Sequence, residues 1–144
     1  QLMFMTPFQS TPSIWVAFRN QDEADSLVTR MESFAQGKKL QSAPEDVLKF
    51  IEDVHRTPLI WLLVDQASSD SRTLISAAEQ AQHLNEFFRC VVVGSENLEA
   101  WPNGTIHLHA NSLSTAILDR LRNESHALRI ANSRLRHMRR LQNR

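Results

Sequence analysis

The stretch Leu59-Ile60-Trp61-Leu62-Leu63-Val64-Asp65 decides the fold of this 144-residue chain. Six apolar residues follow one another with no polar residue between them. An unbroken run of this kind is typical of a strand that is covered on both faces of a parallel sheet. We therefore expect residues 59–64 to form the central strand, with Trp61 almost fully buried and Asp65 at the carboxyl end.

Strand and helix patterns alternate on both sides of this run. Short apolar or alternating stretches predict four further strands, at residues 14–18, 39–41, 91–93 and 105–109. Apolar residues spaced by three and four predict helices over residues 22–34, 44–54 and 72–88. This alternation favours parallel strands with right-handed crossovers. The expected fold class is α/β, a flavodoxin-like (βα)5 three-layer sandwich with a parallel five-stranded sheet and a long C-terminal helix.

Composition excludes several classes of function. The sixteen basic and sixteen acidic residues balance, so no global field attracts nucleic acid or an anionic membrane. A bilayer span needs roughly 20 apolar residues, and no stretch approaches that length. The single cysteine, Cys90, lies in an apolar run, which favours a packed core thiol and a reducing cytoplasm. We expect a cytoplasmic protein without contact to membranes.

No motif for cofactor or metal chemistry is present in the sequence. With only three glycines, the chain has no glycine-rich loop that could hold phosphate groups, and it contains no nucleophile-elbow motif. His107 and His109 share one face of an expected strand, but a surface pair is favoured over metal ligands. We therefore expect no cofactor, no metal and no enzymatic activity.

Two segments carry a resemblance to a known family. They are Ser42-Ala43-Pro44-Glu45-Asp46-Val47-Leu48 and the run from Thr57-Pro58 through Asp65, supported by a hydroxyl residue, Ser95, after the fourth strand. Over about residues 13–125 the chain resembles the receiver domain of two-component response regulators. Receivers have two Mg²⁺-binding acids after strand one, a phosphoaccepting Asp after strand three and a Ser or Thr after strand four. The resemblance implies that Asp65 is the candidate phosphoacceptor and Ser95 the switch-position hydroxyl.

Other positions depart from the receiver pattern. Phe18 and Arg19 stand where the two acids of the metal pocket should be, and neither can ligate Mg²⁺. Receivers also have a Lys after strand five, and here the sequence is His109-Ala110-Asn111-Ser112. Phosphoryl transfer to a carboxylate needs these charges. We therefore expect a degenerate receiver, in which Asp65 caps the following loop, with an atypical phosphoacceptor as the alternative.

The last thirty residues differ in charge from the rest. Residues 1–114 carry a net charge of −6, whereas residues 115–144 carry +6, and no Gly or Pro occurs from Ser112 onward. A long helix is expected, with a seam of heptad type that a second copy would cover. The predicted dimerisation residues are Ile117, Leu121, Leu128, Ala131, Leu135 and Met138.

The basic end of this helix leaves a second interpretation open. Its arginines are Arg134, Arg136, Arg139, Arg140 and Arg144. They could contact the phosphates of nucleic acid, but the segment has no aromatic residue for stacking, and solvated charge flanking a coiled coil is favoured. A nucleic-acid-contacting regulator is thus a lower-ranked alternative.

The expected organisation has three parts. Residues 1–12 are a disordered terminus or are left over from cloning, residues 13–115 form the receiver-like domain, and residues 116–144 form a signalling and dimerisation helix leading to an output domain. The expected function is a non-catalytic pseudo-receiver, which dimerises and regulates the attached output domain in response to a partner or ligand.

Overall fold

The computed structural model describes residues 11–41, 43–57, 59–94, 97–109 and 115–142. The elements in chain order are β1 (Ser13–Ala17), α1 (Gln21–Met31), β2 (Gln36–Lys39), α2 (Pro44–Arg56), β3 (Ile60–Val64), the 3-10 helix η2 (Gln66–Ser68), α3 (Arg72–Leu84), β4 (Arg89–Val93), β5 (Ile106–Leu108) and α4 (Thr115–Gln142). The strands form one sheet in the order β2-β1-β3-β4-β5, and every neighbouring pair is parallel. This is the flavodoxin-like order that the sequence predicts.

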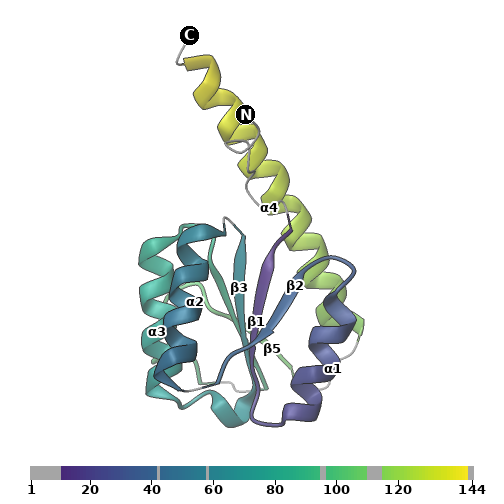
Figure 1. Ribbon diagram of the computed structural model, residues 1–144, viewed down its shortest axis with the longest axis vertical. Helices are drawn as coiled ribbons and strands as arrows, with labels where there is room; N and C mark the ends of the chain where they lie inside the picture. Colours follow the sequence, from purple (N-terminus) through teal and green to yellow (C-terminus); the bar gives the residue numbers. More distant parts are fainter. Residues whose placement is uncertain (1–10, 42, 58, 95–96, 110–114, 143–144) are drawn as a thin grey trace.

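Helices cover both faces of the sheet. Figure 1 shows α2 and α3 on one side and α1 with the first part of α4 on the other. One core cluster joins β-strand side chains to Phe50 and Val54 of α2 and to the alanines of α3. The other joins them to Leu27 and Met31 of α1 and to Leu121 of α4. The three-layer sandwich is therefore confirmed.

Strand β3 lies at the centre of the sheet, as the unbroken apolar run predicts. All five of its residues are buried. Because side chains alternate along a strand, Leu62 faces the α2 and α3 layer while Trp61 and Leu63 face the α1 and α4 layer. Trp61 is 1% exposed, which confirms its expected burial.

The connection between β4 and β5 departs from a strict (βα)5 repeat. Its described residues, 97–105, contain turns but no helix. Trp101 takes the place of helical packing: it is buried in the core cluster beside α3, and its indole Nε1 donates a hydrogen bond to the Ser69 carbonyl oxygen at 2.9 Å. The turn ends at Gly104, whose φ of +91° lies in the region that glycine adopts without strain.

Helix α4 runs back along the sheet from its carboxyl end and continues past the amino end, where it leaves the domain (Figure 1). Leu118 and Leu121 in its first two turns belong to the core of the domain. Both residues lie within the range 116–144 that the sequence assigns to the signalling helix, so the first turns of that helix also belong to the core of the domain. None of the described helices combines the length and apolar character that a bilayer span requires.

Candidate functional site

The Asp65 carboxylate at the end of β3 is tied to the backbone on both sides. One oxygen, Oδ1, accepts a hydrogen bond from the Ser68 backbone N–H at 2.8 Å, and Asp65 thereby caps η2. The other, Oδ2, accepts one from the Arg19 backbone N–H at 2.9 Å. The carboxylate joins the end of β1 to the loop after β3, which confirms the interpretation of Asp65 as a capping residue.

The end of β1 offers no acid to this edge of the sheet. Phe18 is 3% exposed and packs into the core on the α1 and α4 side. Arg19 is exposed, and Asn20 next to it caps α1 by accepting hydrogen bonds from the backbone N–H groups of Asp22 and Glu23. These two acids therefore lie in the first turn of α1, where they complement the helix dipole.

Part of the receiver-like constellation lies outside the described residues. This applies to Ser95, the expected switch-position hydroxyl, and to the segment 110–114 that follows β5. Among the residues that are described, no three His, Cys, Asp or Glu side chains are placed so that they could hold a metal ion. His107 and His109 lie with ring centroids 5.1 Å apart as an edge-on pair.

The structure contains a polar network around Asp53 that the sequence does not predict. Its carboxylate accepts hydrogen bonds from Trp15 Nε1 at 2.7 Å, Thr57 Oγ1 at 2.7 Å and Lys38 Nζ at 3.1 Å. Burial alone would raise the pKa of Asp53, but these hydrogen bonds and the charge of Lys38 outweigh it and lower the pKa. The Lys38 ammonium also lies 5.4 Å from the Trp15 ring centroid. The network joins the last turns of α2 to β1 and β2.

Cys90 is a core thiol, as predicted. It is 4% exposed, and burial raises its pKa to about 12, with a hydrogen bond to Thr105 acting in the opposite direction. A thiol with so high a pKa carries almost no thiolate at neutral pH and is a poor nucleophile.

A pocket of about 540 Å³ lies near the carboxyl edge, between α3 and the β4–β5 connection. Its lining includes Ser69, Arg72, Glu79, Glu99 and Trp101. Asp65 is not part of this lining, so the pocket and the candidate phosphoacceptor are separate features of the edge.

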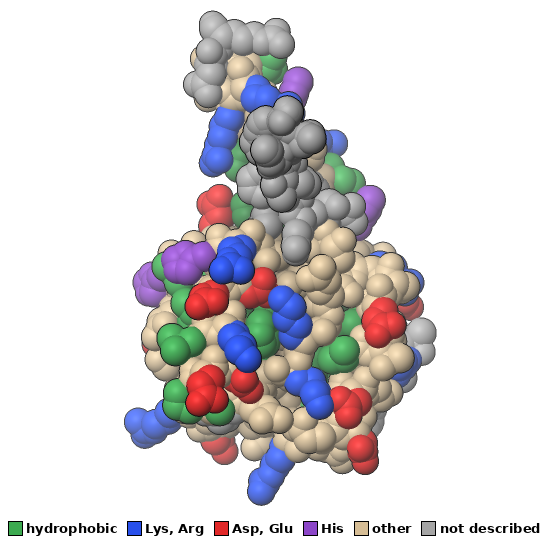
Figure 2. Space-filling view, in the orientation of Figure 1, with side chains coloured by type: hydrophobic (Ala, Val, Ile, Leu, Met, Phe, Trp, Pro, Cys, Tyr) green, Lys and Arg blue, Asp and Glu red, His purple; other side chains and the backbone are tan. Residues whose placement is uncertain are grey.

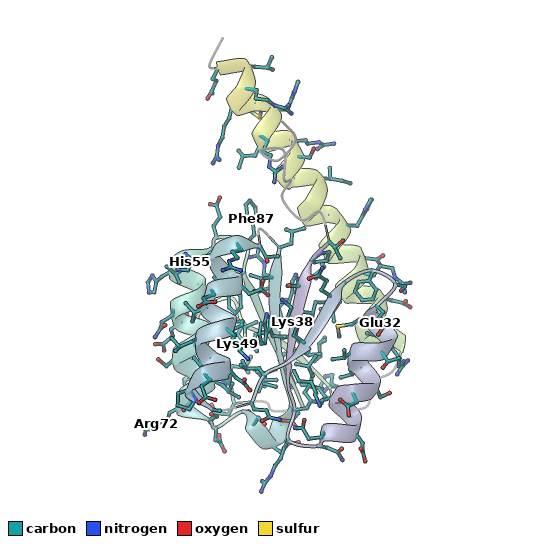
Figure 3. The ribbon with its side chains drawn as sticks, viewed as in Figure 1. Glu32, Lys38, Lys49, His55, Arg72 and Phe87 are labelled. Carbon is teal, nitrogen blue, oxygen red and sulfur yellow. The ribbon has the colours of Figure 1, made fainter. Side chains whose placement is uncertain are left out.

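A second pocket, of about 570 Å³, lies at the opposite edge of the sheet, and we call it the amino-end pocket. Three separate parts of the chain line it: residues 54–57 at the end of α2, residues 83–87 from the end of α3 into the connection to β4, and Arg136 with Arg139 of α4. Figure 2 shows histidine and basic side chains at this edge of the domain, below the protruding helix. In Figure 3, His55 and Phe87 mark the same edge.

The predicted dimerisation seam on α4 is only partly available. Leu121 is 1% exposed and packs against its own sheet, so its assignment to a dimer interface is wrong. Further along the helix Ala131 is exposed, Leu135 is half-buried and Met138 is 57% exposed. Ile130 and Leu141 add exposed apolar surface at 42% and 49%. The side chains of Ile117 and Leu128 lie outside the described part.

Comparisons with known proteins identify no family for this chain. No family model matches it, and no curated protein does. Among solved structures, it is similar to a phosphoheptose isomerase from Francisella tularensis, with a TM-score of 0.42 and 16% sequence identity, over 82% of this chain and 74% of the isomerase chain.

Proposed function

We propose that this chain is a non-catalytic, receiver-like signalling module, a pseudo-receiver, that acts in the cytoplasm and regulates an attached output domain through α4. The observation that carries the proposal is the state of Asp65. Both of its carboxylate oxygens accept backbone hydrogen bonds, and the neighbouring positions on β1 hold Phe18 and Arg19 in place of acids.

The geometry at Asp65 opposes phosphorylation in two ways. A phosphoryl group on either oxygen would compete with the backbone N–H from which that oxygen accepts. The Ser68 hydrogen bond is part-buried and the Arg19 hydrogen bond is exposed. Mg²⁺ would also be needed to offset the charge of the incoming phosphoryl oxygens, and it binds through carboxylates. The buried Phe18 ring and the cationic Arg19 supply no such ligand.

Helix α4 is the element suited to carry a signal from the domain. Its first turns are packed in the core, while its later turns leave the domain and expose Ile130, Met138 and Leu141. A second copy of the chain would cover this apolar surface, since buried apolar area contributes about 25 cal/mol per Å². Parallel pairing would hold two output domains in register.

The phosphorylation chemistry is tested directly. The chain is incubated with Mg²⁺ and acetyl phosphate, or with beryllofluoride, and followed by mass spectrometry and by amide chemical shifts around Asp65. We expect no mass increase and no shift. An increase that is present in the wild type and lost in Asp65→Asn would establish a working phosphoacceptor and contradict the proposal.

The proposed dimer is tested by sedimentation at low and high salt. Salt screens charge over about 10 Å at 0.1 M, so pairing of two arginine-rich helices should strengthen as salt rises. Met138→Glu and Leu128→Glu should give monomers, whereas Leu48→Glu, at a position on α2 that is 64% exposed, should dimerise like the wild type. A wild-type monomer at micromolar concentration in both salts would remove dimerisation from the proposal.

A further inference from the structure

The amino-end pocket brings together positive charge from two helices that are far apart in sequence. Arg56 ends α2, and Arg136 with Arg139 comes from α4 some eighty residues later. His55 and His83 lie beside them, and among the described residues of the lining Glu86 supplies the carboxylate. The pocket volume of about 570 Å³ lies within the range of small-molecule sites, roughly 300–1,000 Å³.

The helix dipoles at this edge do not cancel the positive charge. Helices α2 and α3 both end here, and each C-terminus contributes about half a negative charge. Together with Glu86 they amount to roughly two negative charges against three guanidinium groups, so a net of roughly one positive charge remains.

The carbonyl groups at the end of α2 already have partners. The side-chain amide of Asn85, Nδ2, donates hydrogen bonds to the carbonyl oxygens of Val54 at 3.3 Å and Thr57 at 3.0 Å. Burial and, to a smaller extent, the neighbouring charge of Arg140, which does not line the pocket, lower the pKa of Arg136.

An apolar wall lies next to these cations. Leu84, the last residue of α3, is 45% exposed. The half-buried Phe87 follows it in the connection to β4 (Figure 3). A guanidinium group suits phosphate oxygens through paired N–H donors, and an aromatic ring suits the flat face of a base. Phosphate-binding groups and an apolar surface are thus present in one pocket of limited size.

We propose that the amino-end pocket binds a nucleotide carrying at least two phosphates, with the phosphates between Arg56, Arg136 and Arg139 and the base against Phe87 and Leu84. Such a ligand contacts both α2 and α4 and so fixes the angle at which α4 leaves the domain. Its role as the regulatory input rests on the proposed function above, whereas the binding itself does not.

The test is calorimetric titration of the full chain with ADP, with amide chemical shifts recorded in parallel. We expect one saturable site and shifts at Phe87 and Arg139. Each arginine that contacts phosphate contributes a charge-assisted hydrogen bond, so Arg56→Ala and Arg139→Ala should each weaken binding about tenfold or more. Arg134→Ala is the matched control, because Arg134 is exposed on the same helix and does not line the pocket. It should leave binding within about twofold of wild type.

Several results would overturn the inference. One is the absence of heat and of shifts at millimolar ADP, and another is an Arg134→Ala variant that loses as much affinity as Arg139→Ala. If inorganic pyrophosphate binds as tightly as ADP, the pocket does not recognise a nucleotide, because the base then contributes nothing to the affinity. A single-stranded oligonucleotide that binds far more tightly than ADP and depends on Arg134 would assign the surface to nucleic acid. Phosphate uptake at Asp65 tests the opposite edge, so it can fail or succeed independently of this result.

Discussion

Both edges of the sheet have a pocket of similar volume, about 540 Å³ near the carboxyl edge and about 570 Å³ at the amino edge, but the two edges differ in their charged groups. At the carboxyl edge, where ligands of this fold class usually bind, Asp65 is engaged by the backbone on both oxygens and Phe18 is buried in the core. At the amino edge, arginines of α2 and α4 surround an open pocket. The arginines of α2 and α4 therefore gather at the edge opposite the one where ligands of this fold class usually bind.

The difference follows from the path of α4. In a fold of this type the last helix begins at the carboxyl edge and returns along the sheet. Here it spans Thr115–Gln142, about 42 Å at 1.5 Å per residue, so its basic end passes the amino edge. The charge that the sequence concentrates after residue 114 is thereby placed on the side opposite Asp65.

Trp61→Ala should have the largest effect on the free energy of unfolding, because β3 is the central strand of the sheet and runs from one edge to the other. The side chain is 1% exposed, and truncating a buried Trp costs about 3–5 kcal/mol of unfolding free energy. Urea denaturation measures this loss. Leu48→Ala is the control, since its side chain is 64% exposed and its loss should cost less than about 0.5 kcal/mol.

Trp61→Phe separates packing from hydrogen bonding. Within the described part of the chain, the indole Nε1 is buried without a hydrogen-bond partner. Phe removes that polar group along with some volume, so it should cost much less than Ala. If Trp61→Ala unfolds no more easily than wild type, the assignment of β3 as the central strand of the core is wrong.

Asp53→Asn should have the second-largest effect on stability, and it should loosen the packing of the end of α2 at the amino edge. The carboxylate accepts from Trp15, Thr57 and Lys38, and an amide cannot satisfy three donors, so we expect a loss of about 2–3 kcal/mol at neutral pH. Lys38 is too exposed for its ion pair to add much. Lys39→Ala is the control, because it removes only a surface ion pair to Asp25.

The pH dependence of stability checks the same carboxylate. The folded-state pKa of Asp53 is lowered, so its contribution is complete above the unfolded pKa of about 4 and is lost as pH falls through the folded value. Below that value wild type and Asp53→Asn should converge in stability. If the difference in stability between wild type and Asp53→Asn does not become smaller in acid, the carboxylate charge does not stabilise the end of α2.

The sequence predicts those features that depend on local pattern. The unbroken run 59–64 identifies the central strand, and the alternation of strands and helices predicts a parallel sheet. The lack of acids at Phe18 and Arg19 is visible in the sequence, and so is a capping role for Asp65, because a strand-end acid often accepts from the next loop.

Features that depend on long-range packing could not be predicted. The partners of Asp53 lie 38, 15 and 4 residues away, and only the last of these separations is a helical spacing. Leu121 fits a heptad seam as well as it fits the sheet, and only the position of α4 shows which surface it covers. The amino-end pocket is formed by three separate segments, so no short sequence motif predicts it.

Asp65→Ala should have the smallest effect on stability. It tests the carboxyl edge directly. The substitution removes the cap of η2 and the acceptor for Arg19, and loss of a capping side chain costs about 0.5–2 kcal/mol. Amide hydrogen exchange at Arg19 and Ser68 should speed up, and Asp65→Asn should lie between Ala and wild type because its side chain keeps one carbonyl oxygen. Asp70→Ala is the control, an exposed acid in the same loop. If Asp65→Ala instead stabilised the protein, the carboxylate would be a functional group kept at a cost to the fold. That result would favour a functional role for the carboxyl edge and would contradict the interpretation of Asp65 as a capping residue.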